Sequence, residues 1–330
     1  MHSFKLVLIA SIVSSAFACS SNDDGGLTPD PAGGTGGSSG SGGSGGSSGA
    51  GGSSTLTASE DCNMSGIWAG HQVVQALALN LPQHANSWYY FEISQPQGSV
   101  DWTVTKHFDC GQEIRGTVLV VLPPETLKVH LVHNHQTGRK GKMGKNAAGQ
   151  CEFSAERFWQ IWGAPDRFLP ARNAVEEMSS VSMRLPLPTR AAPEGAEDWD
   201  NDGKLGVAYQ ATGLVSGTRN SVQRSWLQWF SNDQHTIIPA SDWTQIVARS
   251  DFDGEESTFD PESGPLATSS TSDRRPEAPN RVTLKFLGKN ASDPRVGQLI
   301  RGIDPEADIQ AALQTCQAIQ QALPASQPAN

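Results

Sequence analysis

Val100-Asp101-Trp102-Thr103-Val104-Thr105 is the stretch of sequence that decides the fold class. Large apolar residues alternate here with polar ones, and an extended chain places every second side chain on the same face. The pattern therefore predicts a strand with one buried face and one exposed face.

Similar short segments extend in both directions from this one and are separated by turn residues. Before it we expect strands at 66–79 and 88–94, and after it at 117–122, 127–131, 153–162, 181–185, 206–217, 221–230, 243–248 and 282–286. The segment 252–280 is rich in Ser, Pro, Asp and Glu and is expected to be a long loop. Many short strands predict a mainly β protein, an antiparallel barrel or sandwich.

The C-terminal region predicts a helix. Asp304 is suited to cap its start and Pro305 to occupy its first position. The residues that follow form one apolar stripe at helical spacing, which consists of Ile309, Ala312, Leu313, Cys316, Ile319 and Leu323. We expect one C-terminal α-helix that packs on the outside of the β domain through this stripe.

The first 56 residues are not expected to fold. Residues 1–18 contain Lys5 followed by an apolar run, which is typical of a signal peptide and too short to span a membrane as a mature helix. Residues 19–56 contain a Gly/Ser-rich stretch that behaves as a flexible tether. Residues 57–330 are expected to form the β-rich domain, either as one unit or as two halves, 57–190 and 191–330.

Ala16-Phe17-Ala18-Cys19 closes the export segment and resembles the lipobox of bacterial lipoproteins. The resemblance implies that the signal is removed before Cys19 and that acyl chains on Cys19 anchor the protein. In that family, Ser20 implies delivery to the outer membrane of a Gram-negative bacterium, with the domain in the periplasm or at the cell surface. The alternative is an ordinary signal peptide that leaves Cys19 as a free thiol. We favour the anchor, because an exposed thiol in an oxidising space is a liability.

Charge and cysteine content narrow the choice of partners. The formal net charge is −10, which disfavours binding to nucleic acid and gives no attraction to anionic lipid. Four further cysteines, an even number in an exported chain, predict two disulfides among Cys62, Cys110, Cys151 and Cys316. Among the three connectivities we favour Cys110–Cys151 and Cys62–Cys316, and the alternative is free buried thiols. The spacings are too wide for a zinc site.

The segment Gly66-Ile67-Trp68 resembles the G-x-W strand of lipocalin-like barrels. The resemblance implies a barrel in which this strand closes the floor beneath a ligand cavity. A small lipophilic molecule is the partner that such a cavity would take.

In the acidic loop Asp198–Gly206, the spacing of the aspartates predicts a specific ligand. Asp198, Asp200 and Asp202 occupy relative positions 1, 3 and 5, and Gly203 occupies position 6. Three carboxylates around one point, with a glycine at the sharp turn, suit a hard cation such as Ca²⁺. The loop resembles the calcium loops of EF-hands, dockerins and thrombospondin-type repeats. The resemblance implies a structural Ca²⁺ bound by the three aspartates and by the backbone carbonyl of Lys204.

The acidic loop also departs from these families. Position 12 is Tyr209 instead of a glutamate, and Gly206 at position 9 offers no side chain. Water or a distant carboxylate must therefore complete the site, and the candidates are Asp251, Asp253, Glu255 and Glu256. The alternative is an Asp-rich turn without an ion, held by Asx hydrogen bonds. We favour calcium, because three clustered carboxylates repel one another without a cation.

Histidines and tryptophans offer weaker signals. On a strand, His133 and His135 would share a face and could bind a transition metal with one of His71, His107 or His130. We favour the alternative, a polar strand end that leads into a solvated basic hairpin tip at 138–142. The nine tryptophans would suit glycan stacking, but core packing is the interpretation that we adopt.

Catalytic sequence patterns are absent. The chain contains no G-x-S-x-G outside the tether, no H-E-x-x-H and no P-loop. We therefore expect a lipid-anchored, calcium-stabilised β domain of the cell envelope that acts as a binding or structural module. The alternative is an extracytoplasmic hydrolase, and a deep polar cleft with two convergent carboxylates or a His–Asp pair would favour it.

Overall fold

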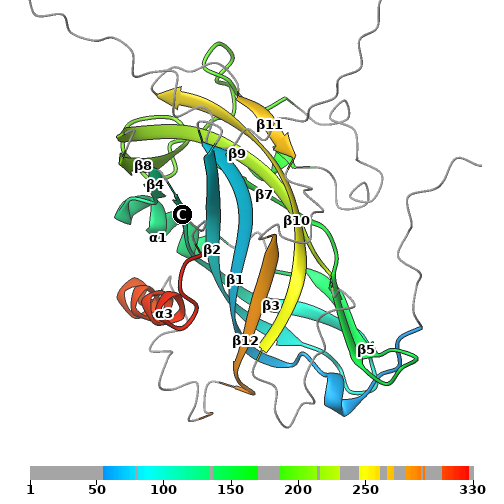
Figure 1. The fold of residues 1–330 in the computed structure, drawn as a ribbon. Helices are drawn as coiled ribbons and strands as arrows, with labels where there is room; N and C mark the ends of the chain where they lie inside the picture. The colour runs from blue at the N-terminus through cyan, green and yellow to red at the C-terminus, as the bar shows by residue number, and fades with distance from the viewer. Residues whose placement is uncertain are drawn as a thin grey trace, which may run out of the picture.

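The computed structural model describes residues 55–78, 81–116, 118–133, 137–169, 186–213, 216–230, 245–260, 266–270, 280–290, 293 and 307–326. The fold is mainly β, and within these residues twelve strands form one antiparallel sheet (Figure 1). The predicted signal peptide, Cys19 and nearly all of the tether lie outside the described residues. None of the helices within the described ranges is long and apolar enough to cross a membrane.

The strands are β1 Gly66–Ala78, β2 Leu81–Ser94, β3 Asp101–Arg115, β4 Val118–Val121, β5 Lys140–Lys145, β6 Cys151–Ala155, β7 Phe158–Trp162, β8 Val207–Gly213, β9 Gly217–Phe230, β10 Gln245–Asp260, β11 Leu266–Ser270 and β12 Arg281–Gly288. Their order is β11-β10-β12-β1-β2-β3-β4-β8-β9-β6-β5, with β7 paired to β9. In addition β9 pairs with β10, and β3 pairs with β5. Pairs β4–β8 and β1–β12 connect the segments before and after residue 190 in one sheet.

The predicted alternation in β3 is confirmed. Trp102 and Val104 are buried in the core, whereas Asp101 is exposed. Trp102 stacks on Phe153 of β6 with ring centroids 5.6 Å apart, so the alternating face of β3 meets aromatic residues of a distant strand. Core packing is also confirmed for the six tryptophans that are buried, which are Trp68, Trp88, Trp102, Trp159, Trp162 and Trp229.

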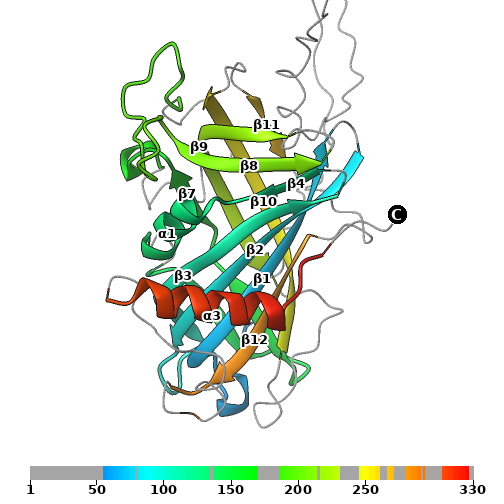
Figure 2. The same cartoon turned by 90° about the vertical axis from the view of Figure 1, so that its left-hand side faces the viewer.

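The C-terminal helix α3, Ile309–Ala322, packs on the outside of the sheet as predicted, and it contacts β2 and β3 (Figure 2). All six residues of the predicted apolar stripe belong to a hydrophobic cluster that α3 forms with β1, β2 and β3, and each is either buried in this cluster or packed against it. The predicted cap is wrong, because Asp308 caps the helix by accepting a hydrogen bond from the backbone N–H of Ala311 over 3.0 Å. Asp304 and Pro305 lie outside the described residues.

Two of the predicted elements are wrong. The segment 127–131 was expected to be a strand but belongs to the helix α1, Pro124–Val132. Its buried side chains are Thr126, His130 and Leu131, which follow helical spacing, while Leu127 and Val129 are only partly buried. The expected loop 252–280 contains the second half of β10 and all of β11, because β10 continues to Asp260 by pairing with β9. Segment 181–185 lies outside the described residues.

The four predicted cysteines form two disulfides, but the favoured pairing is wrong. The bonds are Cys62–Cys151 and Cys110–Cys316. Cys110 is the extra residue of a bulge, because Trp88 of β2 opposes Gly111 while Tyr89 opposes Asp109. The second disulfide fastens α3 to the sheet in the middle of its apolar stripe.

Helix α1 covers a break in the strand pairing. Within β3, only Glu113 and Ile114 pair with the short strand β4, and only residues 101–103 pair with β5. Between these pairings α1 packs against β3, with His130 close to Asp109 and Leu131 in one cluster with Cys110. The helix also contacts β8 and the C-terminal helix α3 (Figure 2).

Candidate metal site in the acidic loop

The acidic loop is a closed turn immediately before β8. The backbone N–H of Trp199 donates to the carbonyl of Gly206 over 3.3 Å, and the N–H of Gly206 donates to the carbonyl of Glu197 over 2.9 Å. Asn201 and Gly203 have positive φ angles of 56° and 84°, which reverse the chain within a few residues. The local sequence thus forms the compact turn that the spacing predicted.

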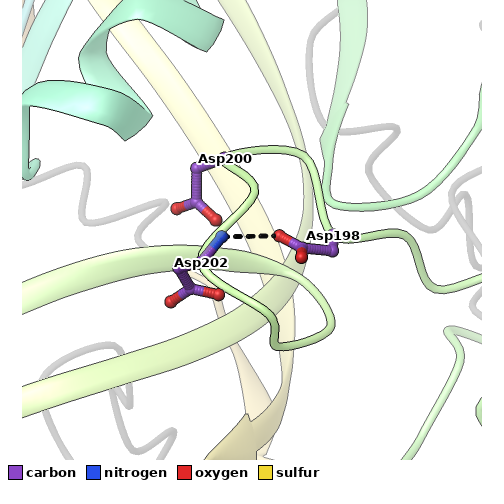
Figure 3. Close-up of side chains that lie close together, drawn as sticks. All are labelled: Asp198, Asp200 and Asp202. Carbon is purple, nitrogen blue, oxygen red and sulfur yellow. Dashed lines mark hydrogen bonds between the residues drawn. The ribbon is translucent and has the colours of Figure 1, made fainter.

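The three predicted carboxylates lie together. One carboxylate oxygen from each of Asp198, Asp200 and Asp202 lies within 4.8 Å of the other two (Figure 3). Asp198 is half-buried, Asp200 is buried and Asp202 is exposed, so the cluster reaches from the surface inward. Carboxylate oxygens at such separations can surround one hard cation.

Short-range hydrogen bonds order two of the carboxylates. Asp198 accepts from the N–H of Asp202 over 3.2 Å, drawn in Figure 3, and from the N–H of Gly203 over 2.9 Å. Oδ1 of Asp202 accepts from the N–H of Lys204 over 2.9 Å. These are the Asx-type bonds of the ion-free alternative, and they also hold the carboxylates in place for an ion.

Asp200 accepts hydrogen bonds from two other elements through one carboxylate oxygen, and its second oxygen has no hydrogen-bond partner among the described residues. Its Oδ2 accepts from the Thr126 hydroxyl of α1 over 2.5 Å and from the N–H of Ala208 in β8 over 2.8 Å. The residue is only 6% exposed, and its Oδ1 is buried with no hydrogen-bond partner among the described residues. In Figure 3 the Asp200 carboxylate points toward Asp202. A buried carboxylate oxygen without a donor is costly, and a bound cation would satisfy it.

Asn220 of β9 belongs to the same cluster and was not predicted. It is fully buried, and its Nδ2 donates to Oδ2 of Asp202 over 2.7 Å. Its Oδ1 is buried and has no hydrogen-bond partner in the described part of the chain. No sequence signal marks Asn220, because its place depends on its pairing with Ala208 across β8 and β9.

The structure gives different results for the other predicted calcium ligands. Glu256 lies apart from the triad and forms a buried ion pair with Arg219, with Nε and Oε1 3.1 Å apart. The N–H of Lys204 contacts Asp202, and ligation by its carbonyl stays a prediction. The side chains of Asp251, Asp253 and Glu255 lie outside those that the structure describes.

The histidines do not form a second metal cluster within the described residues. His133 follows the end of α1 and not a strand, and its ring lies 4.5 Å from Trp199 and 5.4 Å from Trp162. Burial lowers the pKa of His133 below its usual value, against the opposing effect of Asp166. His71 bonds to Asn86, and His107 packs on Tyr89 and Phe91, while His135 lies outside the described residues.

A buried His–Asp pair lies beside the acidic loop. Nδ1 of His130 is 3.6 Å from Oδ2 of Asp109, and both side chains are fully buried. The His130 ring stacks on Trp162 with centroids 3.7 Å apart. Burial, reinforced by Glu256, Asp109 and Asp200, raises the pKa of the nearby Tyr209 well above its usual value. The region behind the loop is therefore rich in ionisable groups that are shielded from solvent.

The prediction of a hairpin tip at 138–142 is wrong, because Lys140, Gly141 and Lys142 belong to β5, which pairs with β3 and β6. Lys140 and Lys142 are exposed, but Arg139 is only 5% exposed. Its guanidinium lies over Trp229 at 3.7 Å and over Phe158 at 4.2 Å from the ring centroids. Burial lowers the pKa of Arg139 to about 9.

No family model, curated protein or solved structure matches this chain.

Proposed function

We propose that this protein is a lipid-anchored domain of a Gram-negative cell envelope whose acidic loop binds a structural Ca²⁺. The observation that carries the calcium proposal is Asp200, a buried carboxylate with one oxygen that has no hydrogen-bond partner among the described residues and with two neighbouring carboxylates within 4.8 Å. The exported location rests on the signal-like segment and on the lipobox resemblance at Cys19.

The donor set favours calcium over other metals. All side-chain donors gathered in the acidic loop are carboxylate oxygens, whereas zinc prefers Cys and His. A rotation of the Asn220 amide would bring its Oδ1 to the position beside Asp202 that Nδ2 now occupies. Three aspartates, the Asn220 amide, the Lys204 carbonyl and water can supply the six to eight oxygens that calcium takes.

The position of the loop suggests that the ion is structural. The three carboxylates are linked to α1 through Thr126, to β8 through Ala208 and to β9 through Asn220. An ion that neutralises them would stabilise the point where these three elements meet. Binding to the folded state alone stabilises a protein by about 2.7 kcal/mol when the ligand is a hundredfold above Kd.

Isothermal titration of the full-length protein with CaCl₂ tests this proposal. A Kd on the order of 10⁻⁴ to 10⁻³ M is expected, as for extracellular calcium modules. MgCl₂ should bind more weakly, because Mg²⁺ demands a rigid octahedral site and loses its water reluctantly. If neither ion gives a heat of binding, the loop is an Asx-rich turn.

The strand pairings support a barrel over a sandwich. They can be followed from β12 through β1, β2, β3, β4, β8, β9 and β10 back to β12. One core cluster of fully buried aromatic residues joins strands on different sides of this path, including Trp68, Phe91 and Trp229. These side chains fill space that a lipophilic or glycan ligand would need, which favours a structural role for the domain.

The His–Asp pair is the observation that favours the hydrolase alternative. A catalytic base must reach the proton that it removes from a substrate. His130 and Asp109 are both fully buried, and Trp162 covers one face of the His130 ring. The pair therefore supports a role in holding α1 against β3 better than a role in catalysis.

The anchor is tested by Cys19→Ser. Acyl chains contribute about 0.8 kcal/mol per buried CH₂ group, so two or three chains bind a membrane durably. The variant should move from the membrane fraction to the soluble fraction, and mass spectrometry should show acylated Cys19 only in the wild type. A wild-type protein that is soluble and carries no acyl chain would contradict the anchor.

A further inference from the structure

Helix α1 depends on its neighbours for stability. It has nine residues, and such short helices are not stable alone in water. Its N-cap residue is Pro123, which makes no side-chain capping bond. Contacts with the rest of the protein must therefore hold it in place.

The acidic loop contacts α1 at both ends. At the start of the helix, the Thr126 hydroxyl donates to Oδ2 of Asp200 over 2.5 Å. At the other end, the ring of His133 lies 4.5 Å from the ring of Trp199. Trp199 and Asp200 are consecutive loop residues, so a change in the conformation of the loop reaches both ends of the helix.

The Thr126 hydroxyl is one of two donors to the Asp200 carboxylate, and the other is the N–H of Ala208. Thr126 is fully buried, and its hydroxyl donates to Oδ2, which leaves Oδ1 of Asp200 as the oxygen without a partner. Hydrogen-bond donors behind a metal ligand fix its direction, and their removal lowers metal affinity by about 10- to 100-fold.

From this geometry we infer that Thr126 is a positioning residue for the calcium site and that calcium and the docked helix α1 stabilise each other through it. This inference rests on the proposed calcium binding. Coupling between two binding equilibria is reciprocal, so a helix that orients Asp200 raises calcium affinity, and bound calcium holds the helix in place. Through this coupling the ion would stabilise the docking of α1 over β3, between the parts of β3 that pair with β4 and with β5.

The test compares Thr126→Val with Thr126→Ser in the full-length protein. Valine has nearly the shape of threonine but cannot donate, whereas serine keeps the hydroxyl. Thr315→Val is the matched control, since Thr315 is also buried in a helix but bonds to the Ala311 carbonyl of its own helix. Calcium affinity is measured by titration with CaCl₂, and hydrogen exchange of the α1 amides is measured with and without CaCl₂.

Thr126→Val should raise the calcium Kd by about tenfold or more. Thr126→Ser and Thr315→Val should keep a Kd close to that of the wild type. Calcium should slow exchange in 124–132 in the wild type and in Thr126→Ser, and not in Thr126→Val. Two results would overturn the inference while leaving calcium binding intact. One is a calcium Kd in Thr126→Val equal to that of the wild type. The other is hydrogen exchange of the wild-type α1 amides that is the same with and without calcium. A wild-type protein that binds no calcium overturns the proposed function and this inference together.

Discussion

The Asn220 amide donates to Oδ2 of Asp202 over 2.7 Å, which joins the exposed side of the acidic loop to the buried face of β9. The two residues are 18 positions apart in sequence. Because of this hydrogen bond, replacing Asn220 with aspartate changes the charge of the candidate site while keeping nearly the same side-chain shape.

Asn220→Asp should make the protein more dependent on calcium. The substitution adds a fourth carboxylate beside Asp202 and removes the donated hydrogen bond, at a cost of about 1–3 kcal/mol without the ion. Calcium gains one more anionic ligand, so the difference between the thermal midpoints in EGTA and in CaCl₂ should widen.

Asn146→Asp is the matched control for this change. The Asn146 side-chain oxygen accepts from the N–H groups of Ala148 and Gln150 in a turn outside the acidic loop, and aspartate keeps that acceptor. Its two midpoints should differ as in the wild type. An Asn220→Asp protein with an unchanged difference would show that Asn220 does not face the ion.

Two glycines of the loop should respond very differently to alanine. Gly206 has φ +100°, and an added Cβ would lie 2.6 Å from the backbone of Ser221. Gly203 has φ +84°, but an added Cβ would meet nothing within 4 Å. Gly203→Ala should therefore cost about 1–2 kcal/mol from backbone strain alone, and Gly206→Ala should cost a further 1–3 kcal/mol, roughly, from the clash.

Urea denaturation of the two glycine variants measures this contrast. Equal losses would mean that β9 moves easily away from the loop. That result would also weaken the proposal that the loop holds α1, β8 and β9 together.

His71 should make the stability dependent on pH. Burial, opposed by the hydrogen bond to Asn86, lowers its pKa from 6.5 to about 4. Between these values the unfolded chain binds a proton that the folded chain does not, so stability is present above pH 6.5 and is lost as the pH falls toward 4. The loss is on the order of 3 kcal/mol when complete.

Urea midpoints between pH 4.5 and 7.5 in His71→Gln test this dependence. Glutamine keeps a polar group near Asn86 but does not titrate, so stability should fall less steeply with acid than in the wild type. His84→Gln serves for comparison, because His84 also has a pKa lowered by burial but is more exposed, and its effect on the slope should be smaller. A His71→Gln slope equal to that of the wild type would contradict the assignment.

The sequence predicted those elements whose pattern of polar and apolar residues lies within one short segment. The alternation at 100–105 marked β3, and the apolar stripe marked α3. The prediction for 127–131 is wrong, because Leu127, Val129 and Leu131 alternate as in a strand, whereas Leu127 and Val129 are only partly buried and Leu131 is buried with Thr126 and His130 at helical spacing. Polar and apolar periodicity cannot separate a strand from a helix over so few residues.

Long-range pairing explains what the sequence did not show. The triad was predictable because its three aspartates lie within five residues. Asn220 and Thr126 join it only through the register of β8 with β9 and the docking of α1. The disulfide connectivity likewise depends on the bulge at Cys110 and on the place where α3 crosses β3, neither of which leaves a local pattern.

Calcium binding at the acidic loop is tested most directly by Asp200→Asn. Asparagine keeps an oxygen for Thr126 and Ala208 but replaces the unused Oδ1 of Asp200 with an amide that cannot bind a cation. The measurement is the thermal midpoint of the full-length protein and of this variant, each in EGTA and in 10 mM CaCl₂. Calcium should raise the wild-type midpoint by about 3–10 °C and should leave that of Asp200→Asn unchanged. A wild-type midpoint that is the same in both solutions, or an equal rise in the variant, would contradict the site.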